Sequence, residues 1–221
     1  MLVVHHLNNS RSQRVLWLLE ELEVPYEIKF YQRGPDMLAP KELRAVHPLG
    51  KSPVITDAGH TIAESGAILE YVTENYGNGH LIPRPRTPER LRYTYWLHYA
   101  EGSAMTPLLQ KLVFTRLPSR APVLLRPVMT MVSRQLNANL VDPALKRHMD
   151  YWEQELGKSE WFAGDEFSAA DIQMSFPLEA ASARGGLSAG RPKCMAFLEK
   201  IHARAAYQRA LARGGSYALA R

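Results

Sequence analysis

Short apolar runs and one amphipathic segment alternate at the start of the chain. Residues 2–7 are mostly apolar and partly β-branched, which predicts a strand. From residue 14 to residue 23 the apolar positions recur every three or four residues, as in a helix that packs one stripe against a core. These positions are Val15, Leu18, Leu19 and Leu22. A second strand is predicted over residues 26–31, and two strands separated by a helix form a parallel, right-handed crossover unit.

A hairpin and a further helix follow. Residues 40–46 form a looser helical segment, and residues 54–57 and 60–63 are short strands joined by a turn that contains Gly59. Another helix is predicted over residues 65–76. The order βαβαββα is that of a thioredoxin-like domain, an α/β fold whose mixed sheet is covered by helices.

The remainder of the chain has helical periodicity, so an all-α domain is predicted after the α/β domain. Two glycines and two prolines between residues 77 and 86 are typical of a linker. Thr87 and Pro88 combine a capping residue with proline at the first helical position, which predicts a helix that runs to about Phe114. The predicted organisation is a thioredoxin-like domain over residues 1–78, a linker over 79–87 and an all-helical domain over 88–221.

Later signals lie inside the helical domain. Asp142 and Pro143 repeat the start signal before another helix. Ser168 can cap the amide of Asp171, whose carboxylate can reach back, and the pair predicts a capping box. The tail over residues 214–221 is expected to fray.

Composition narrows the class of protein. The 221 residues are 46% hydrophobic and 22% charged, which excludes a disordered or fibrous chain. No run reaches the roughly 18 apolar residues of a membrane span, and no leader pattern precedes the first strand, so a cytoplasmic protein is expected. The single cysteine, Cys194, cannot form an internal disulfide, and no Cys/His spacing indicates a metal site. Any thiol chemistry would therefore use the thiol of another molecule.

The net charge of +5 is unevenly distributed along the chain. Residues 1–80 carry 7 Lys/Arg against 10 Asp/Glu, and the rest carries 20 against 12. The arginines of the basic part are scattered through helical patterns, which favours a solvated surface over a nucleic-acid site. We expect neither a nucleic acid nor a membrane as partner.

Several short motifs occur at a characteristic joint spacing. They are Ser10 in the loop after the first strand, Lys51, Ser52 and Pro53 before the third strand, Glu64 and Ser65 at the following helix, and the capping box at Ser168–Asp171. Together they resemble the cytosolic glutathione S-transferase family, in particular bacterial members with a serine in the first loop. The resemblance covers nearly the whole chain. It implies a cytoplasmic homodimer of detoxifying function that uses glutathione as co-substrate, without a metal, and transfers it to alkyl or aryl electrophiles.

The chemistry of glutathione suggests a role for each binding residue. Glu64 can bind the γ-glutamyl ammonium, and the helix N-terminus at Ser65 can bind its carboxylate. Alternatively, Ser65 is a simple N-cap and Glu64 a first-turn acid. In a thioredoxin-like fold Pro53 is expected to be cis, and the backbone of Ser52 could then pair with the cysteinyl backbone. Lys51 is a candidate for the glycine carboxylate, and the alternative is a trans proline beside a solvated lysine.

Ser10 is the predicted catalytic residue. A free thiol has a pKa near 8.5 and is mostly protonated at neutral pH, so a hydroxyl donor that stabilises the thiolate would activate it. No histidine or carboxylate is expected to act as a base for Ser10 itself. Alternatively Ser10 only caps the first helix, and the neighbouring Asn8, Asn9 and Ser12 compete for the thiolate. Arg11 could contact the thiolate or extend into solvent.

The electrophile site has the weakest signals. Asn9, Tyr99 and Ser103 are candidates, the latter two because the family lines this pocket with the first long helix of the second domain. His5 and His6 lie next to each other on a strand, point to opposite faces and cannot bind one metal ion. The alternatives to a transferase are a non-catalytic glutathione-binding or interaction protein and a specialised glutathione-dependent dehalogenase or isomerase.

Overall fold

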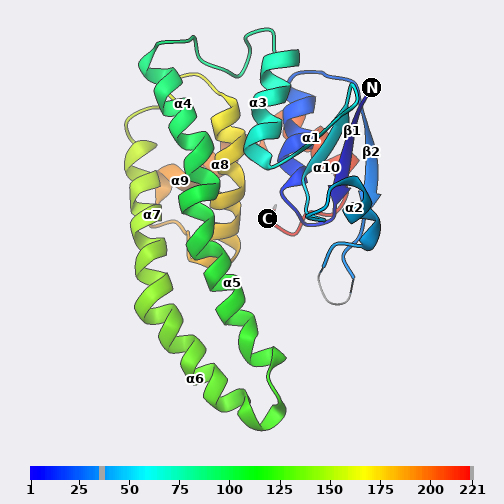
Figure 1. Ribbon diagram of the computed structural model, residues 1–221. Coiled ribbons are helices and arrows are strands. Elements are labelled where there is room, and N and C mark those ends of the chain that lie inside the picture. The colour runs from blue at the N-terminus through cyan, green and yellow to red at the C-terminus, as the bar shows by residue number, and fades with distance from the viewer. Residues whose placement is uncertain (35–37, 220–221) are drawn as a thin grey trace.

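The computed structural model describes residues 1–34 and 38–219, and these form an α/β half and a helical half (Figure 1). The elements of the α/β half are β1 (Leu2–Leu7), α1 (Ser12–Glu21), β2 (Tyr26–Tyr31), α2 (Lys41–Val46), β3 (Val54–Asp57), β4 (His60–Ala63) and α3 (Ser65–Tyr76). The predicted order βαβαββα is confirmed. The four strands and α3 have the predicted bounds, whereas α1 begins two residues earlier and ends at Glu21.

The sheet has the mixed topology of a thioredoxin-like domain. Its strand order is β2-β1-β3-β4. β1 runs parallel to β2, with Val4 opposite Ile28, and antiparallel to β3, with Val4 opposite Ile55. β3 and β4 form the predicted antiparallel hairpin. The chain segment that follows β1 and the one that precedes β3 therefore lie side by side at the same end of the sheet.

The helical half begins after the segment that follows Tyr76. Its α-helices are α4 (Pro88–Tyr99), α5 (Met105–Arg120), α6 (Arg126–Leu136), α7 (Asp142–Glu155), α8 (Ala169–Ala180), α9 (Pro192–His202) and α10 (Ala205–Gly214). Thr87 caps α4 by accepting the N–H of Arg90, as its sequence predicts. The predicted capping box of α8 is also present, with the N–H of Ser168 donating to the carboxylate of Asp171.

Two long helices continue through prolines. π-Helical segments join α4 to α5, over Ala100–Ala104, and α6 to α7, over Asn137–Val141. The predicted helix start at Asp142 and Pro143 is confirmed by the bounds of α7, although a π-helical segment connects α7 directly to α6. A proline has no N–H to donate, and its ring collides with the carbonyl four residues earlier in a regular α-helix. For Pro143 and for Pro107 that carbonyl lies in the π-helical segment, where the wider turn accommodates it.

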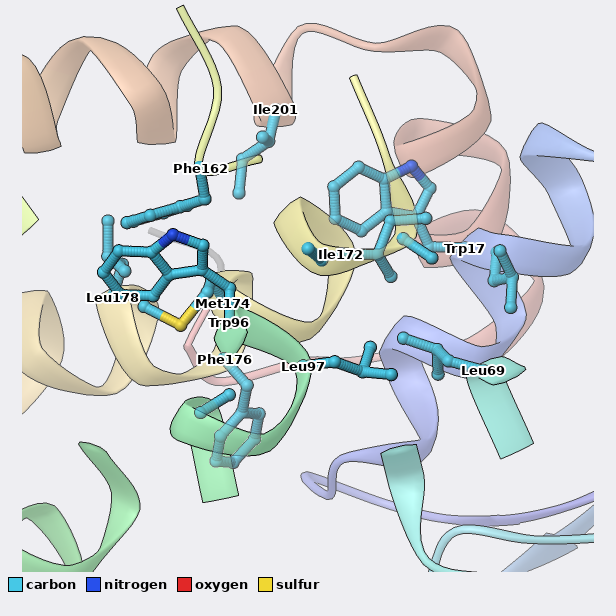
Figure 2. Close-up of a cluster of buried hydrophobic side chains, with 14 of the residues drawn as sticks. Trp17, Leu69, Trp96, Leu97, Phe162, Ile172, Met174, Phe176, Leu178 and Ile201 are labelled. Atoms are coloured by element: carbon cyan, nitrogen blue, oxygen red, sulfur yellow. The ribbon is translucent and has the colours of Figure 1, made fainter. Parts of the chain in front are cut away.

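Both halves share one hydrophobic core around α1. Residues 12–20 are all buried, so α1 does not bury a single stripe as predicted. The reason is that α1 packs against β1 and α3 on one side and against α8 and α10 on the other. Figure 2 shows Trp17 of α1 beside Ile172 of α8, and Leu69 of α3 facing Leu97 of α4. The relative placement of the two halves is thus set by apolar packing.

The C-terminal helix and tail are held against the α/β half. The side chain of Glu20 accepts hydrogen bonds from Arg209 and Arg213 at 2.8 and 3.0 Å. Beyond α10, the Tyr217 hydroxyl donates to the buried Glu179 carboxylate at 2.6 Å. The prediction of a frayed tail is therefore wrong for residues 214–219, because Tyr217 supplies a partner to that carboxylate. Residues 220 and 221 lie outside the described part of the chain.

Candidate functional site

A small pocket collects residues from separate segments of the chain. It has a volume of about 90 Å³. Its lining residues are Arg11, His47, Leu49, Lys51, Ser52, Pro53, Ala63, Glu64, Ser65 and Glu101. The five predicted glutathione-binding residues are therefore brought together, although up to 14 positions separate them in the sequence.

One wall of the pocket is formed by the segment that precedes β3, and its backbone has the predicted cis proline. The peptide bond between Ser52 and Pro53 is cis, and the alternative of a trans proline is wrong. Pro53 is buried, whereas Lys51 is exposed. The Ser52 hydroxyl accepts a hydrogen bond from Ser10 Oγ at 3.3 Å, which connects this wall to the loop after β1.

The opposite wall is the N-terminus of α3. Glu64 is the N-cap residue and Ser65 is the first helical residue, so the alternative in which Ser65 is the N-cap is wrong. The Ser65 side chain is buried and Glu64 is exposed. The first N–H groups of a helix have no intrahelical partner and carry the positive end of its dipole. This wall therefore combines donors for an anion with one carboxylate for a cation.

The backbone of Glu64 has an unusual conformation, with φ of 72° and ψ of 126°. Residues with a Cβ are strained there by about 1–3 kcal/mol, and such strain often occurs at functional sites. We expect Glu64→Gly to raise the free energy of unfolding by about 1 kcal/mol, because relief of strain exceeds the entropy cost of glycine. Urea unfolding measures the change. Glu70→Gly, in the interior of the same helix, is the control and should lose about 1 kcal/mol; a loss in both variants would contradict strain at Glu64.

Ser10 is buried where the loop after β1 meets the start of α1. Its hydroxyl oxygen accepts the N–H of Ser12 at 3.2 Å and lies 2.7 Å from the Ser12 hydroxyl. The N-cap residue of α1 is Arg11 and not Ser10, but Ser10 accepts the N–H of the first helical residue and also reaches Ser52 on the pocket wall. Its position allows both roles.

The prediction that no histidine or carboxylate acts as a base for Ser10 stays a prediction, but His6 is connected to Ser10 through the Ser12 side chain. The Nδ1 atom of His6 lies 2.9 Å from the Ser12 hydroxyl, and this hydroxyl contacts Ser10. His5 points to the opposite face of the sheet, as predicted, where its ring contacts Tyr31 and Thr56. The proximity of His6 and Ser12 was missed because it depends on how tightly the chain turns between β1 and α1.

A charged cluster borders the pocket at the junction of the two halves. Glu101 pairs with Arg11 at 3.2 Å and with Arg14 at 2.5 Å. Arg14 is 2% exposed and also donates to the backbone carbonyl and side-chain oxygen of Gln173. Both arginines lie over the ring of Phe176. Burial lowers the pKa of Arg14, and the Glu101 carboxylate opposes that change. Arg11 therefore pairs with a carboxylate rather than extending freely into solvent.

The three electrophile-site candidates do not line this pocket. The Asn9 side-chain oxygen accepts the N–H of Ala218 in the tail. The Tyr99 hydroxyl pairs with His148 Nδ1 at 2.5 Å and accepts from Trp152, and burial raises its pKa. Ser103 is exposed in the π-helical segment after α4. Tyr99 is therefore engaged within the helical half, and the candidates stay predictions.

Two negative findings apply to residues 1–34 and 38–219. No helix there is both long and apolar enough to cross a membrane. No group of three or more His, Cys, Asp or Glu side chains there could hold a metal ion. The lone Cys194 is buried, and burial raises the pKa of its thiol, so it is held as an unreactive thiol.

Comparison with known proteins agrees with this architecture. Residues 1–74 match the family described as "Glutathione S-transferase, N-terminal domain", and residues 135–200 match "Glutathione S-transferase, C-terminal domain". The chain is 39% identical to Glutathione S-transferase 3 of Schizosaccharomyces pombe, over 82% of this chain and 74% of that protein. It is 34% identical to Glutathione S-transferase 1 of Saccharomyces cerevisiae, over 82% and 81%.

Solved structures resemble the fold as a whole. A glutathione S-transferase from Actinobacillus pleuropneumoniae superposes with a TM-score of 0.81 at 28% identity and covers 100% of this chain and 96% of its own. A sphingomonad glutathione S-transferase solved in complex with glutathione has a TM-score of 0.75 at 22% identity, covering 96% and 98%. At that identity the second likeness supports the fold only.

Proposed function

Because the chain belongs to the glutathione S-transferase family, we propose that it transfers glutathione to an electrophilic carbon of a small hydrophobic substrate. The observation that carries this proposal is the pocket that unites the segments before β3 and at the start of α3. It offers a carboxylate, a lysine and free helix N–H groups, which suit the ammonium and carboxylates of the tripeptide.

Each pocket residue takes one part of glutathione in this proposal. Glu64 binds the γ-glutamyl ammonium, and Ser65 with the N-terminus of α3 binds the γ-glutamyl carboxylate. The backbone of Ser52 pairs with the cysteinyl residue, and Lys51 binds the glycine carboxylate. The support for this assignment is that these residues line one pocket with opposite charges on its two walls.

Ser10 stabilises the thiolate in this proposal. The thiolate attacks the electrophilic carbon, a carbon–sulfur bond forms and the leaving group departs with the electron pair of its broken bond. Binding both reactants in one site supplies proximity. Ser10 is the candidate because its hydroxyl reaches Ser52, beside which the cysteinyl backbone is proposed to bind.

Ser65→Ala tests the glutathione site. Removal of a buried hydroxyl that binds a carboxylate is expected to weaken glutathione binding by about 1–3 kcal/mol, which is about 5- to 150-fold in Kd. Titration calorimetry measures Kd, and an activated aryl halide measures turnover of the wild type. Ser182→Ala is the control, because Ser182 is exposed and is not among the residues that line the pocket.

The outcomes separate the candidate functions. Wild-type binding together with turnover supports a transferase, and binding without turnover of aryl or alkyl electrophiles supports a non-catalytic glutathione-binding protein. Conversion of a chlorinated or isomerisable substrate supports the specialised dehalogenase or isomerase. Absence of glutathione binding in the wild type would overturn the proposal.

We also propose a cytoplasmic homodimer with a detoxifying role, in keeping with the family resemblance. Exposed apolar side chains on the helical hairpin of α5 and α6 support a protein interface. They are Leu109, Val113, Val123, Leu124, Leu125, Val128 and Met131. Leu124 is 92% exposed, so a partner surface would remove much apolar area from water.

A further inference from the structure

A chain of hydrogen bonds connects Ser10 to a buried histidine. Ser10 Oγ lies 2.7 Å from Ser12 Oγ, and Ser12 Oγ lies 2.9 Å from His6 Nδ1. All three side chains are buried, and His6 is only 3% exposed. The proposed thiolate site at Ser10 is therefore one end of a short relay, and an imidazole nitrogen is the other end.

The direction of these hydrogen bonds follows from the donor inventory. His6 also hydrogen-bonds the backbone of Gly214 at the end of α10. Since Nδ1 faces Ser12, the Gly214 carbonyl is left for an N–H at Nε2, and the neutral ring then accepts at Nδ1. Ser12 then donates its hydroxyl proton to Nδ1. The single hydroxyl proton of Ser10 can be donated either to Ser52, at 3.3 Å, or to Ser12, at 2.7 Å, and the relay uses the shorter contact. The Ser10 oxygen keeps a lone pair that can accept a proton from a thiol.

We propose that Ser12 and His6 are positioning residues that draw the proton of bound glutathione away from its sulfur through Ser10. The proposal rests on the proposed function, because it requires the glutathione sulfur at Ser10. The thiol proton passes to Ser10, the Ser10 proton to Ser12, and the Ser12 proton to His6 Nδ1. One S–H bond breaks and one N–H bond forms, so the products are a thiolate and an imidazolium.

The reversed relay explains how Ser10 can stabilise the thiolate. After the shift, protonated His6 donates to Ser12, Ser12 donates to Ser10, and the Ser10 hydroxyl donates to the sulfur. The bond to the charged sulfur is of the strong, charge-assisted kind. The relay therefore provides both an acceptor for the proton and a donor for the anion.

The surroundings of His6 contain no charged side chain among the contacts of residues 1–34 and 38–219. β2 contributes the edge of the Phe30 ring, with centroids 5.8 Å apart, α1 contributes Ser12, and α10 contributes the Gly214 backbone. Burial lowers the pKa of His6, and the Gly214 carbonyl opposes this change. His6 is thus neutral before glutathione binds at neutral pH, and the thiolate supplies the only nearby counter-charge.

A proton count on the wild type tests the relay directly. Calorimetry of glutathione binding in buffers of different ionisation enthalpy gives the protons released, and thiolate absorbance gives the amount of thiolate formed. The relay predicts thiolate formation with almost no proton release, because the proton stays on His6. Release of one proton per thiolate would overturn the relay and leave the proposed transferase function standing. Bound glutathione without thiolate, or no binding, would overturn both.

Variants identify the path of the proton. Ser12→Ala and His6→Gln are each expected to reduce the thiolate fraction at neutral pH about tenfold, and the remaining thiolate should release its proton to the buffer. His5→Gln is the matched control, since His5 is a buried histidine on the same strand, 5% exposed, with its ring on the other face. Equal thiolate fractions in all these folded variants would overturn the relay.

Discussion

Ser10→Ala is expected to lower the rate of glutathione conjugation about 10- to 150-fold at neutral pH while glutathione stays bound. A hydrogen bond to a charged acceptor contributes about 1.5–3 kcal/mol, and about 1.4 kcal/mol corresponds to a factor of ten. The loss should appear in kcat rather than in Kd, because the hydroxyl interacts with the sulfur and not with the ends of the tripeptide. The measurements are kcat as a function of pH and the calorimetric Kd.

The same experiment decides between Ser10 and its neighbour. Asn9→Ala is the comparison variant, because the Asn9 side chain is bonded to the N–H of Ala218 in the tail. A large loss of rate in Asn9→Ala with none in Ser10→Ala would assign the thiolate contact to Asn9. If Ser10→Ala abolished glutathione binding with the fold preserved, the division between binding and activating residues would be wrong. Thermal unfolding checks the fold, since Ser10 also accepts the N–H of Ser12.

The parts of the fold that could be predicted depend on nearby residues. The strands β1 to β4 and helix α3 have the predicted bounds, because alternating apolar residues, turn residues and capping residues act within a few positions. The capping box at Ser168 and Asp171 is predictable for the same reason. The candidate binding residues beside β3 and α3 line one pocket, and they could be singled out from the sequence because each belongs to a short motif at a fixed place in the fold.

The parts that could not be predicted depend on contacts between distant positions. Arg14 bonds Gln173, and Arg204, expected on a solvated surface, pairs with Glu21. No local sequence pattern predicts that Glu101 borders the pocket. The direct connection of α6 to α7 was not predicted, because a helix start signal and a π-helical turn are compatible with the same residues. His6 was missed because a strand pattern gives the face of a side chain and not its partner.

Asp171→Ala is expected to lower the free energy of unfolding by about 3–5 kcal/mol, the largest stability effect that we predict. Asp171 is completely buried. Its carboxylate accepts the N–H of Phe162 at 2.8 Å and the N–H and hydroxyl of Ser168 at 2.9 and 3.0 Å. Alanine leaves these donors buried without an acceptor, and each unsatisfied group costs about 1–3 kcal/mol. The loop before α8 can rearrange partly, so the expected loss of unfolding free energy is smaller than the sum of the costs of the three unsatisfied donors.

Urea unfolding of Asp171→Ala and of two control variants tests this prediction. Asp165→Ala removes an exposed carboxylate from the same loop and should change the unfolding free energy by less than about 0.5 kcal/mol. Ser168→Ala removes only the hydroxyl and should cost about 1 kcal/mol. The free energy of unfolding of a native protein is about 5–15 kcal/mol, so the loss expected for Asp171→Ala is a large share of the total stability. Equal losses in Asp171→Ala and Ser168→Ala would show that the backbone N–H groups find other acceptors, and that Asp171 does not by itself join α8 to the segment at Phe162.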